Sequence, residues 1–208
     1  MRHIFRGLFL AVVISAAMSA LRPGHSFTSG LWQSLPRCST SFWLPTGTDT
    51  VRASSSPLAL HFSPTENLEH FDIEVIRQSR SHLDIAMYAF TDQAIARAVA
   101  EVATRGVHVR IYRDREQYQQ EQARNSYIAD LFRGNPNIEI RVKKSRTLMH
   151  LKQYWTGQVL RDGSANMSPS GLKAQNNSLT LTTNADDIRL FQANFNEMWG
   201  RSDNIVIQ

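Results

Sequence analysis

The feature that most constrains this chain is a change of hydrophobic period between residues 82 and 112. Residues 82–90 alternate as a half-buried strand does, and the next segment repeats apolar side chains at helical spacing: Ile95, Val99 and Val102. Thr91 or Asp92 supplies an N-cap for that helix, and Gly106 stands at the expected C′ position. Residues 107–112 return to strand character. This order predicts a βαβ unit with parallel strands and a right-handed crossover.

The same alternation of elements continues on both sides of this unit. Upstream, residues 58–62 predict a short strand, and Ser63-Pro64-Thr65-Glu66 matches a capping box for a helix reaching Arg80. Downstream, the patterns predict a helix over 117–132, strands over 138–142, 154–160 and 178–183, and a closing helix over 185–199. We therefore expect an α/β fold in which helices flank a mixed sheet.

The first 57 residues differ from the rest in composition and hydrophobic pattern. Residues 1–25 combine a basic start, a short apolar run and small residues, which predicts a secretory signal peptide or a retained N-terminal anchor. Residues 26–57 are rich in Ser, Thr, Pro and Gly and predict a linker or extension before a domain over 58–208. The expected location is secreted, periplasmic or tethered to a membrane. Because Cys38 is the only cysteine, an intrachain disulfide and a thiolate metal cluster are both excluded.

Positive charge is concentrated in the middle of the chain. Residues 105–152 hold eleven Lys and Arg against five Asp and Glu, whereas the rest of the chain after residue 25 holds nine against thirteen. A basic segment beside an acidic remainder suits a polymer that carries phosphates, and the alternative is a solvated surface. Five cations are candidates for contact with such a substrate: Arg141, Lys143, Lys144, Arg146 and Lys173.

Two short motifs carry the chemistry. His150 and Lys152 are two residues apart, so on a strand both side chains would project from one face. After the next predicted strand, Gly163-Ser164-x-Asn166 forms a turn that would present a hydroxyl, an amide and backbone N–H groups to an oxyanion. A nucleophile, a cation and neutral donors are what phosphoryl transfer without a metal requires.

These motifs resemble the phospholipase D superfamily, whose signature is H-x-K-x4-D followed by G-S-x-N. Three flanking segments are similar to that family as well: residues 85–91, residues 105–110 and the C-terminal run with Phe191, Phe195 and Trp199. The resemblance implies a phospholipase D-like half-domain in which His150 forms a phosphohistidine and Lys152, Ser164 and Asn166 bind the phosphate oxygens. It implies no metal and no cofactor.

The resemblance also implies a homodimer. Only one motif is present, and single-motif members such as the bacterial endonuclease Nuc and the Zucchini-like nucleases bring two copies of the histidine together. Two positions depart from the family pattern. Gly157 stands where the motif has Asp, and Asn176 stands in the stretch where the family places an acid that orients the histidine. An amide at Asn176 cannot stabilise an imidazolium by charge, so reduced activity is one expectation.

Three functions follow from these observations. The first is an endonuclease that cleaves DNA or RNA, favoured by the basic residues that lead into His150. The second is a phospholipase or phosphatidyl transferase, which would use the same histidine on a lipid phosphodiester. The third is a degenerate relative that binds nucleic acid or phospholipid without turnover. Among the other histidines, His61, His70, His82 and His108 fall on different predicted elements and share no ligand spacing.

Overall fold

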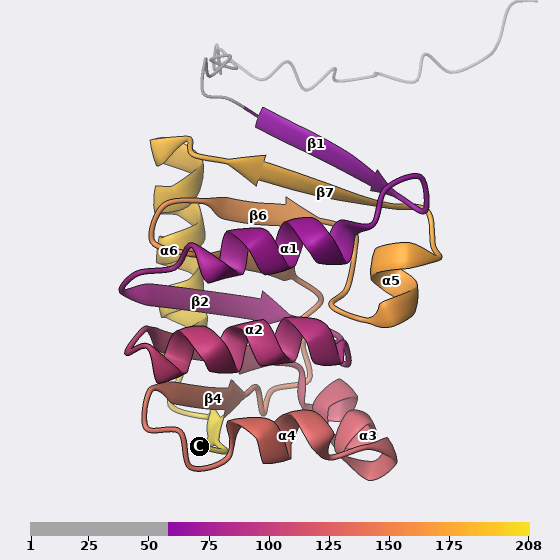
Figure 1. The fold of residues 1–208 in the computed structure, drawn as a ribbon. Helices are drawn as coiled ribbons and strands as arrows, with labels where there is room; N and C mark the ends of the chain where they lie inside the picture. Colours follow the sequence, from indigo (N-terminus) through magenta and orange to yellow (C-terminus); the bar gives the residue numbers. More distant parts are fainter. Residues whose placement is uncertain (1–57) are drawn as a thin grey trace, which may run out of the picture. The chain divides into compact units, whose positions relative to one another are not determined.

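The structure is a computed structural model that describes residues 58–208. Its centre is an eight-stranded sheet in the order β1-β7-β6-β5-β2-β3-β4-β8 (Figure 1). The strands are β1 (Leu58–Ser63), β2 (His82–Met87), β3 (His108–Arg113), β4 (Ile138–Val142), β5 (Lys152–Trp155), β6 (Leu160–Gly163), β7 (Asn177–Thr182) and β8 (Ile205–Val206). The helices are α1 (Leu68–Arg77), α2 (Gln93–Thr104), α3 (Arg115–Arg124), α4 (Tyr127–Phe132), α5 (Pro169–Lys173) and α6 (Ala185–Trp199).

The sheet is mixed, as the sequence predicts. Strands β2, β3 and β4 are parallel, and the β2-α2-β3 unit is the predicted βαβ element. Every other pairing is antiparallel, including β5 on β2 and β6 on β5. Because β5 runs opposite to β2, its first residues lie at the edge where β2 and β3 end. This topology brings the His150 segment to the carboxyl ends of two parallel strands, the usual place for a site in an α/β sheet.

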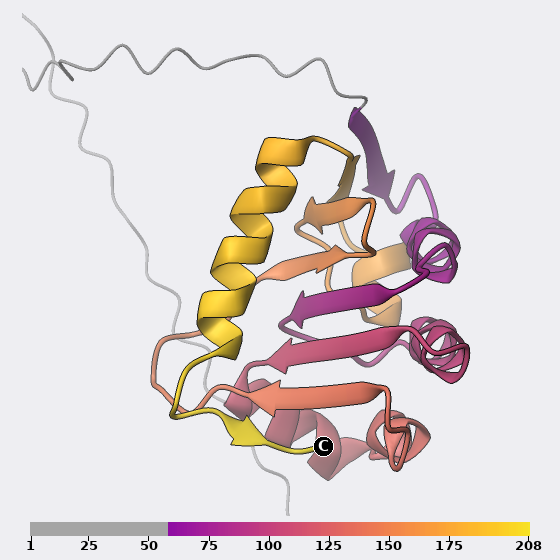
Figure 2. The same ribbon diagram turned by 90° about the vertical axis from the view of Figure 1, so that its left-hand side faces the viewer.

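Helices cover both faces of the sheet. In Figure 2, α6 lies against one face, and α1, α2 and α4 lie on the other. Two apolar clusters fill the spaces between these layers. The larger one joins α1 and α2 to the sheet around Ile76, Ile85 and Val99. The smaller one packs Phe191, Phe195 and other α6 side chains onto the opposite face.

Local signals fixed most of the element boundaries. Asp92 is the N-cap of α2, and its carboxylate accepts from the backbone N–H groups of Ala94 and Ile95. Gly106 has φ of +92°, as a C′ glycine requires. The closing helix spans the predicted residues 185–199. These three predictions are confirmed. They succeeded because helix boundaries depend mainly on residues within about one turn.

Three predicted elements need correction. The capping box at Ser63 is wrong, since Ser63 ends β1, its hydroxyl donates to the carbonyl of Gln175, and α1 begins later with Asn67 as its cap. The helix over 117–132 is two helices, because Asn125 adopts an extended conformation and ends α3. The strand over 154–160 is a hairpin of β5 and β6, which turns at Gly157 with φ of +90°.

The predicted signal or anchor over 1–25 and the predicted linker over 26–57 lie outside the described residues. Within residues 58–208, no helix combines the length and apolar character needed to cross a membrane.

Candidate active site

The candidate site lies at the edge of the sheet where β2 and β3 end and β5 begins. Lys152, the first residue of β5, is the register partner of Met87 at the end of β2. One residue further on, the backbone N–H of Tyr88 donates to the carbonyl of Leu151 at 2.9 Å. These two contacts fix the backbone at Leu151 and Lys152, and His150 is the residue directly before them.

His150, Lys152 and Tyr88 form a contact group at this edge. The Lys152 ammonium donates to Nδ1 of His150 at 3.1 Å and to the His150 carbonyl at 2.7 Å. The rings of Tyr88 and His150 lie 4.6 Å apart between centroids, and Lys152 Nζ lies 5.3 Å from the Tyr88 ring centre. The predicted convergence of His150 and Lys152 is therefore present. An ammonium only donates, so Nδ1 of His150 accepts in this contact.

The electrostatic surroundings favour a neutral imidazole. His150 is exposed, but desolvation of its ring by neighbouring groups lowers its pKa, and the Lys152 ammonium lowers that pKa further. Burial also lowers the pKa of Lys152 itself, and the Arg161 guanidinium acts in the same direction. A neutral imidazole has a nitrogen lone pair that can attack phosphorus, whereas an imidazolium does not.

A carboxylate that sequence reasoning missed lies beside His150. Asp114 follows β3 directly, caps α3, and accepts from the backbone N–H of Met149 at 3.2 Å. It is buried, and its charge raises the pKa of His150 against the two stronger lowering effects. The available signal was an aspartate at the carboxyl end of a parallel strand, where site residues gather in α/β sheets.

The Gly163 to Asn166 turn lies at the end of β6. Gly163 has φ of +149°, and a Cβ there would lie 2.2 Å from the carbonyl oxygen of Ser178. The Ser164 hydroxyl donates to Oδ1 of Asn177 at 2.9 Å and accepts from the backbone N–H of Ser178 at 2.9 Å. Ser164 therefore fixes the turn onto β7, and its only hydroxyl hydrogen is used within the chain.

Asn166 joins this turn to the end of β2. Its Oδ1 accepts from the backbone N–H of Ala89 at 3.1 Å, which sets the orientation of the amide. Within residues 58–208, no hydrogen bond occupies its Nδ2 group, so both hydrogens remain for a ligand. Asn166 thus has the free donor that Ser164 lacks.

A buried ion pair connects the two segments that carry the motifs. Arg161 and Asp72 are both fully buried, with Nε to Oδ1 at 3.2 Å. The Arg161 guanidinium also donates to the carbonyl of Lys152 at 2.6 Å and to the carbonyl of Ala165 at 3.0 Å. One side chain therefore fastens the Lys152 strand to the Ser164 turn. Burial raises the pKa of Asp72 despite this pairing.

Three of the predicted substrate cations are engaged elsewhere in the chain. Arg141 donates to the carbonyl of Trp199 at 2.8 Å and lies over its ring. Lys143 is buried and donates to the carbonyl of Ser145. Lys173 forms ion pairs with Glu69 and Asp92. All three cations therefore have partners within the chain before any substrate binds.

Lys144, Arg146 and Asn176 are exposed, and no hydrogen bond or ion pair engages their side chains within the described part of the chain. Lys144 and Arg146 lie in the loop that leads from β4 to His150. The structure uses Asn177, the neighbour of Asn176, to hold Ser164.

Gly157, in place of the motif Asp, lies in the β5–β6 turn. Among the described residues, no group of three His, Cys, Asp or Glu side chains could hold a metal.

Comparison with known proteins points to one family. Residues 73–199 match the family described as cardiolipin synthase, PLD-like domain. A mitochondrial cardiolipin hydrolase from Chlamydomonas reinhardtii is 32% identical over 118 residues, covering 56% of this chain and 51% of that protein. A protein of the same name from Danio rerio is 23% identical over 131 residues, covering 63% of this chain and 56% of that protein. The chain spans about half the length of these curated relatives.

Solved structures share the fold. Nuc from Salmonella typhimurium, a phospholipase D family member, superposes with a TM-score of 0.63 at 18% identity, covering 74% of this chain and 99% of that one. NucT from Helicobacter pylori gives a TM-score of 0.60 at 23% identity, covering 72% and 98%. Together with the family match over more than half of its length, these likenesses show that the chain belongs to the phospholipase D superfamily and has the PLD-like domain fold.

Proposed function

We propose that this protein is a metal-independent phosphodiesterase that cleaves nucleic acid through a phosphohistidine on His150. The observation that carries the proposal is the contact between Lys152 Nζ and His150 Nδ1 at the edge of the sheet. A phosphate oxygen would compete with the imidazole for the Lys152 ammonium. Substrate binding would therefore place the cation on the phosphate and release the ring from this hydrogen bond.

The reaction proceeds in two displacements. A lone pair of the neutral His150 ring attacks phosphorus, a P–N bond forms, and the P–O bond to the leaving oxygen breaks. Lys152 and the free Nδ2 group of Asn166 hold the non-bridging oxygens as negative charge grows on them. A water molecule then attacks the phosphohistidine and gives up a proton to the histidine of a second copy of the chain, the P–N bond breaks, and His150 returns to its neutral form.

The leaving oxygen requires a proton, and we propose that a second copy of the chain provides it from its own His150, which enters the reaction protonated. Once neutral, the partner's His150 accepts the proton of the attacking water. Within residues 58–208, the other histidines are His61, His70, His82 and His108, which lie on β1, α1, β2 and β3 respectively. His82 and His108 begin their strands, at the edge opposite the site. Leu148, two residues before His150, is 59% exposed, and a dimer that brings the two histidines together would bury this side chain.

Nucleic acid is favoured over lipid by the loop that precedes His150. Lys144 and Arg146 are exposed there with no partner among the described residues, and such cations contact successive phosphates of a polymer. The alternative is a lipid phosphodiester, which the names of the curated relatives favour. The same histidine chemistry serves both substrates. We also propose, from residues 1–25 alone, that the protein acts outside the cytoplasm or on a membrane.

A binder without turnover is the third function that the sequence left open. Asn176 does not contact His150 through any described hydrogen bond, so it gives the imidazolium no support. Asp114, however, places a carboxylate close enough to raise the pKa of His150. This carboxylate supports a working histidine despite the departures at Gly157 and Asn176.

The test is hydrolysis by the full chain in excess EDTA. Substrates are single-stranded DNA, duplex DNA, RNA and cardiolipin vesicles, and His150→Ala is compared with His82→Ala, which changes an exposed histidine far from the site. We expect nucleic-acid cleavage that His82→Ala retains and His150→Ala abolishes. A phosphorylated His150 peptide should be recovered by mass spectrometry after rapid alkaline quench. Cleavage only of cardiolipin would move the proposal to lipid, and cleavage that persists in His150→Ala would refute it.

A further inference from the structure

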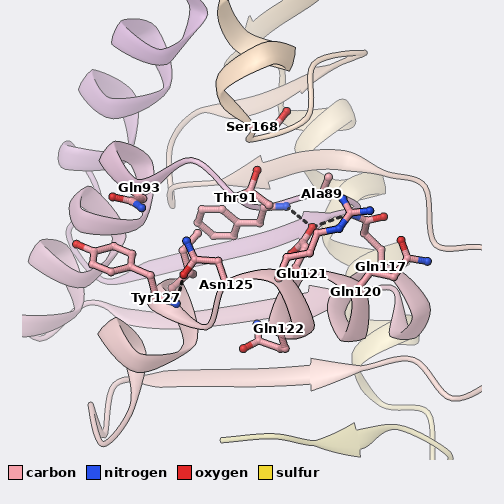
Figure 3. A pocket seen from close by; sticks show the side chains of 13 residues that line it. Ala89, Thr91, Gln93, Gln117, Gln120, Glu121, Gln122, Asn125, Tyr127 and Ser168 are labelled. Carbon is pink, nitrogen blue, oxygen red and sulfur yellow. Dashed lines mark hydrogen bonds between the residues drawn. The ribbon is translucent and has the colours of Figure 1, made fainter. Parts of the chain in front are cut away.

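A polar pocket lies beside the proposed catalytic site and has no role in the mechanism above. It has a volume of about 370 Å³, within the size range of small-molecule sites. Figure 3 shows its lining side chains, which come from residues 89–93 after β2 and at the start of α2, from residues 117–128 in α3 and the start of α4, and from Ser168 before α5. The pocket is therefore built where three separate parts of the chain meet.

The pocket shares its wall with the site. Ala89 lines the pocket, and its backbone N–H is the group that Asn166 holds at 3.1 Å. Ser168, two residues after Asn166, lines the same wall. The next backbone positions are tied as well, since Thr91 N–H donates to the carbonyl of Met167 at 2.8 Å. A phosphate bound at Asn166 would thus have its neighbouring substituent at the mouth of this pocket.

The lining is rich in carboxamides. Gln93 from α2 and Gln120 and Gln122 from α3 line the pocket, and no hydrogen bond engages these three side chains within residues 58–208. Asn125 also lines it, and its Oδ1 accepts from the backbone N–H of Tyr127, so the Asn125 amide hydrogens remain available. Each carboxamide offers a donor and an acceptor side by side.

Charge is nearly absent from the pocket interior. Glu121 is buried there, but Arg113 pairs with it at 2.5 Å, and the Phe90 backbone N–H and the Gln117 amide donate to its other oxygen. Arg124 is the remaining charged side chain of the lining, and it is exposed. A neutral wall of amides does not favour a phosphate or an acyl chain. It suits an uncharged planar ring with hydrogen-bonding edges.

We propose that this pocket binds one nucleobase of the substrate, on the nucleotide next to the cleaved phosphodiester, and that adenine is its preferred base. The preference follows from carboxamide geometry, because Asn and Gln pair with adenine through two hydrogen bonds. Tyr127, at the rim, offers an aromatic face on which a base can stack. This inference rests on the proposed nuclease function and adds a sequence preference to it.

The variant that tests the pocket is Gln93→Ala combined with Gln120→Ala. Both side chains lie on helices and are exposed, and alanine is the better helix former, so the fold should be retained. Gln119→Ala is the matched control, since Gln119 is an exposed glutamine of the same helix that does not line the pocket. Thermal unfolding of all three proteins checks that they are folded.

Cleavage of a randomised single-stranded oligonucleotide pool is sequenced for each protein. We expect adenine to be enriched at one position next to the cut by about tenfold, the scale of one bidentate contact. The double variant should lose this enrichment while still cleaving, and Gln119→Ala should retain it. Cleavage without any base preference, or a preference that the double variant retains, overturns the pocket and leaves the nuclease function standing. If the wild-type protein prefers another base and the double variant loses that preference, the base pocket stands and only the choice of adenine is overturned.

A binding measurement separates this result from failure of the proposed function. His150→Ala, with and without the two glutamine changes, is titrated with an oligonucleotide that carries adenine or an abasic site at the tested position. If the wild-type protein cleaves no nucleic acid, the nuclease function fails. Tighter binding of the adenine strand that the glutamine changes abolish would then still support a base pocket, and equal binding of both strands would refute it.

Discussion

Removing the buried Arg161 guanidinium should destabilise the domain strongly and in a pH-dependent way. In Arg161→Met, the Asp72 carboxylate keeps its full burial and loses the guanidinium that pairs with it. The carbonyl oxygens of Lys152 and Ala165 lose their donors in the same step. Breaking a buried pair by removing one partner costs about 3–5 kcal/mol. For a domain of this size, that loss lowers the melting temperature by about 6–20 °C.

The destabilisation by Arg161→Met should depend on pH, because it depends on whether Asp72 is ionised. Burial already raises the pKa of Asp72 above its ordinary value, and loss of Arg161 removes the main effect that lowers it. An acid with a raised folded pKa favours the folded state at low pH and loses that contribution as pH rises through the folded pKa. The destabilisation by Arg161→Met should therefore be greater at pH 8 than at pH 5, because a proton neutralises Asp72 in acid.

Urea unfolding of wild type and variant at both pH values is the measurement. Asp72→Leu combined with Arg161→Met should recover much of the loss, since neutral packing replaces both charges. Arg77→Met is the matched control, because the Arg77 and Glu101 pair is exposed and worth about 0–1 kcal/mol. A cost below about 1 kcal/mol for Arg161→Met, equal at both pH values, would refute the reasoning.

Three further predictions concern the site. In an NMR titration of His150, Lys152→Met should raise the pKa of the imidazole and Asp114→Asn should lower it, because the two charges act in opposite directions. Shifts of the pKa in the same direction would contradict the assignment. Gly163→Ala should cost about 2–4 kcal/mol in urea unfolding, since its Cβ would meet the Ser178 backbone, whereas Gly106→Ala has open space and should cost about 1 kcal/mol. Asn177→Ala should cost about 1–2 kcal/mol and reduce turnover by loosening Ser164, while Asn176→Ala should change neither; the reverse pattern would restore Asn176 as the functional amide.

The sequence by itself determined the parts of the fold that depend on near neighbours. Hydrophobic period located the βαβ unit, Asp92 began α2, and Gly106 ended it, because caps and turns are decided within about one helical turn. The spacing of His150 and Lys152 predicted that the two side chains would meet, and they do, although His150 precedes β5 and only Lys152 lies on the strand. The error at Ser63 arose where a local signal competed with a contact made elsewhere in the chain. The error at Asn125 arose from a local turn within the helical pattern, in which Asn125 accepts from the backbone N–H of Tyr127.

Only the tertiary structure decided which polar side chains meet. Arg161 and Asp72 are 89 residues apart and meet because Arg161 lies on β6 and Asp72 lies on α1, which packs on the sheet. Asp114 lies beside His150 because β5 runs antiparallel to β2 at the edge where β3 ends. Lys173 and Arg141 contact Glu69 and Trp199 for the same reason, so their charge could not reveal their role. Local pattern encodes each strand and helix, whereas the partner of a side chain depends on how these elements are arranged in space.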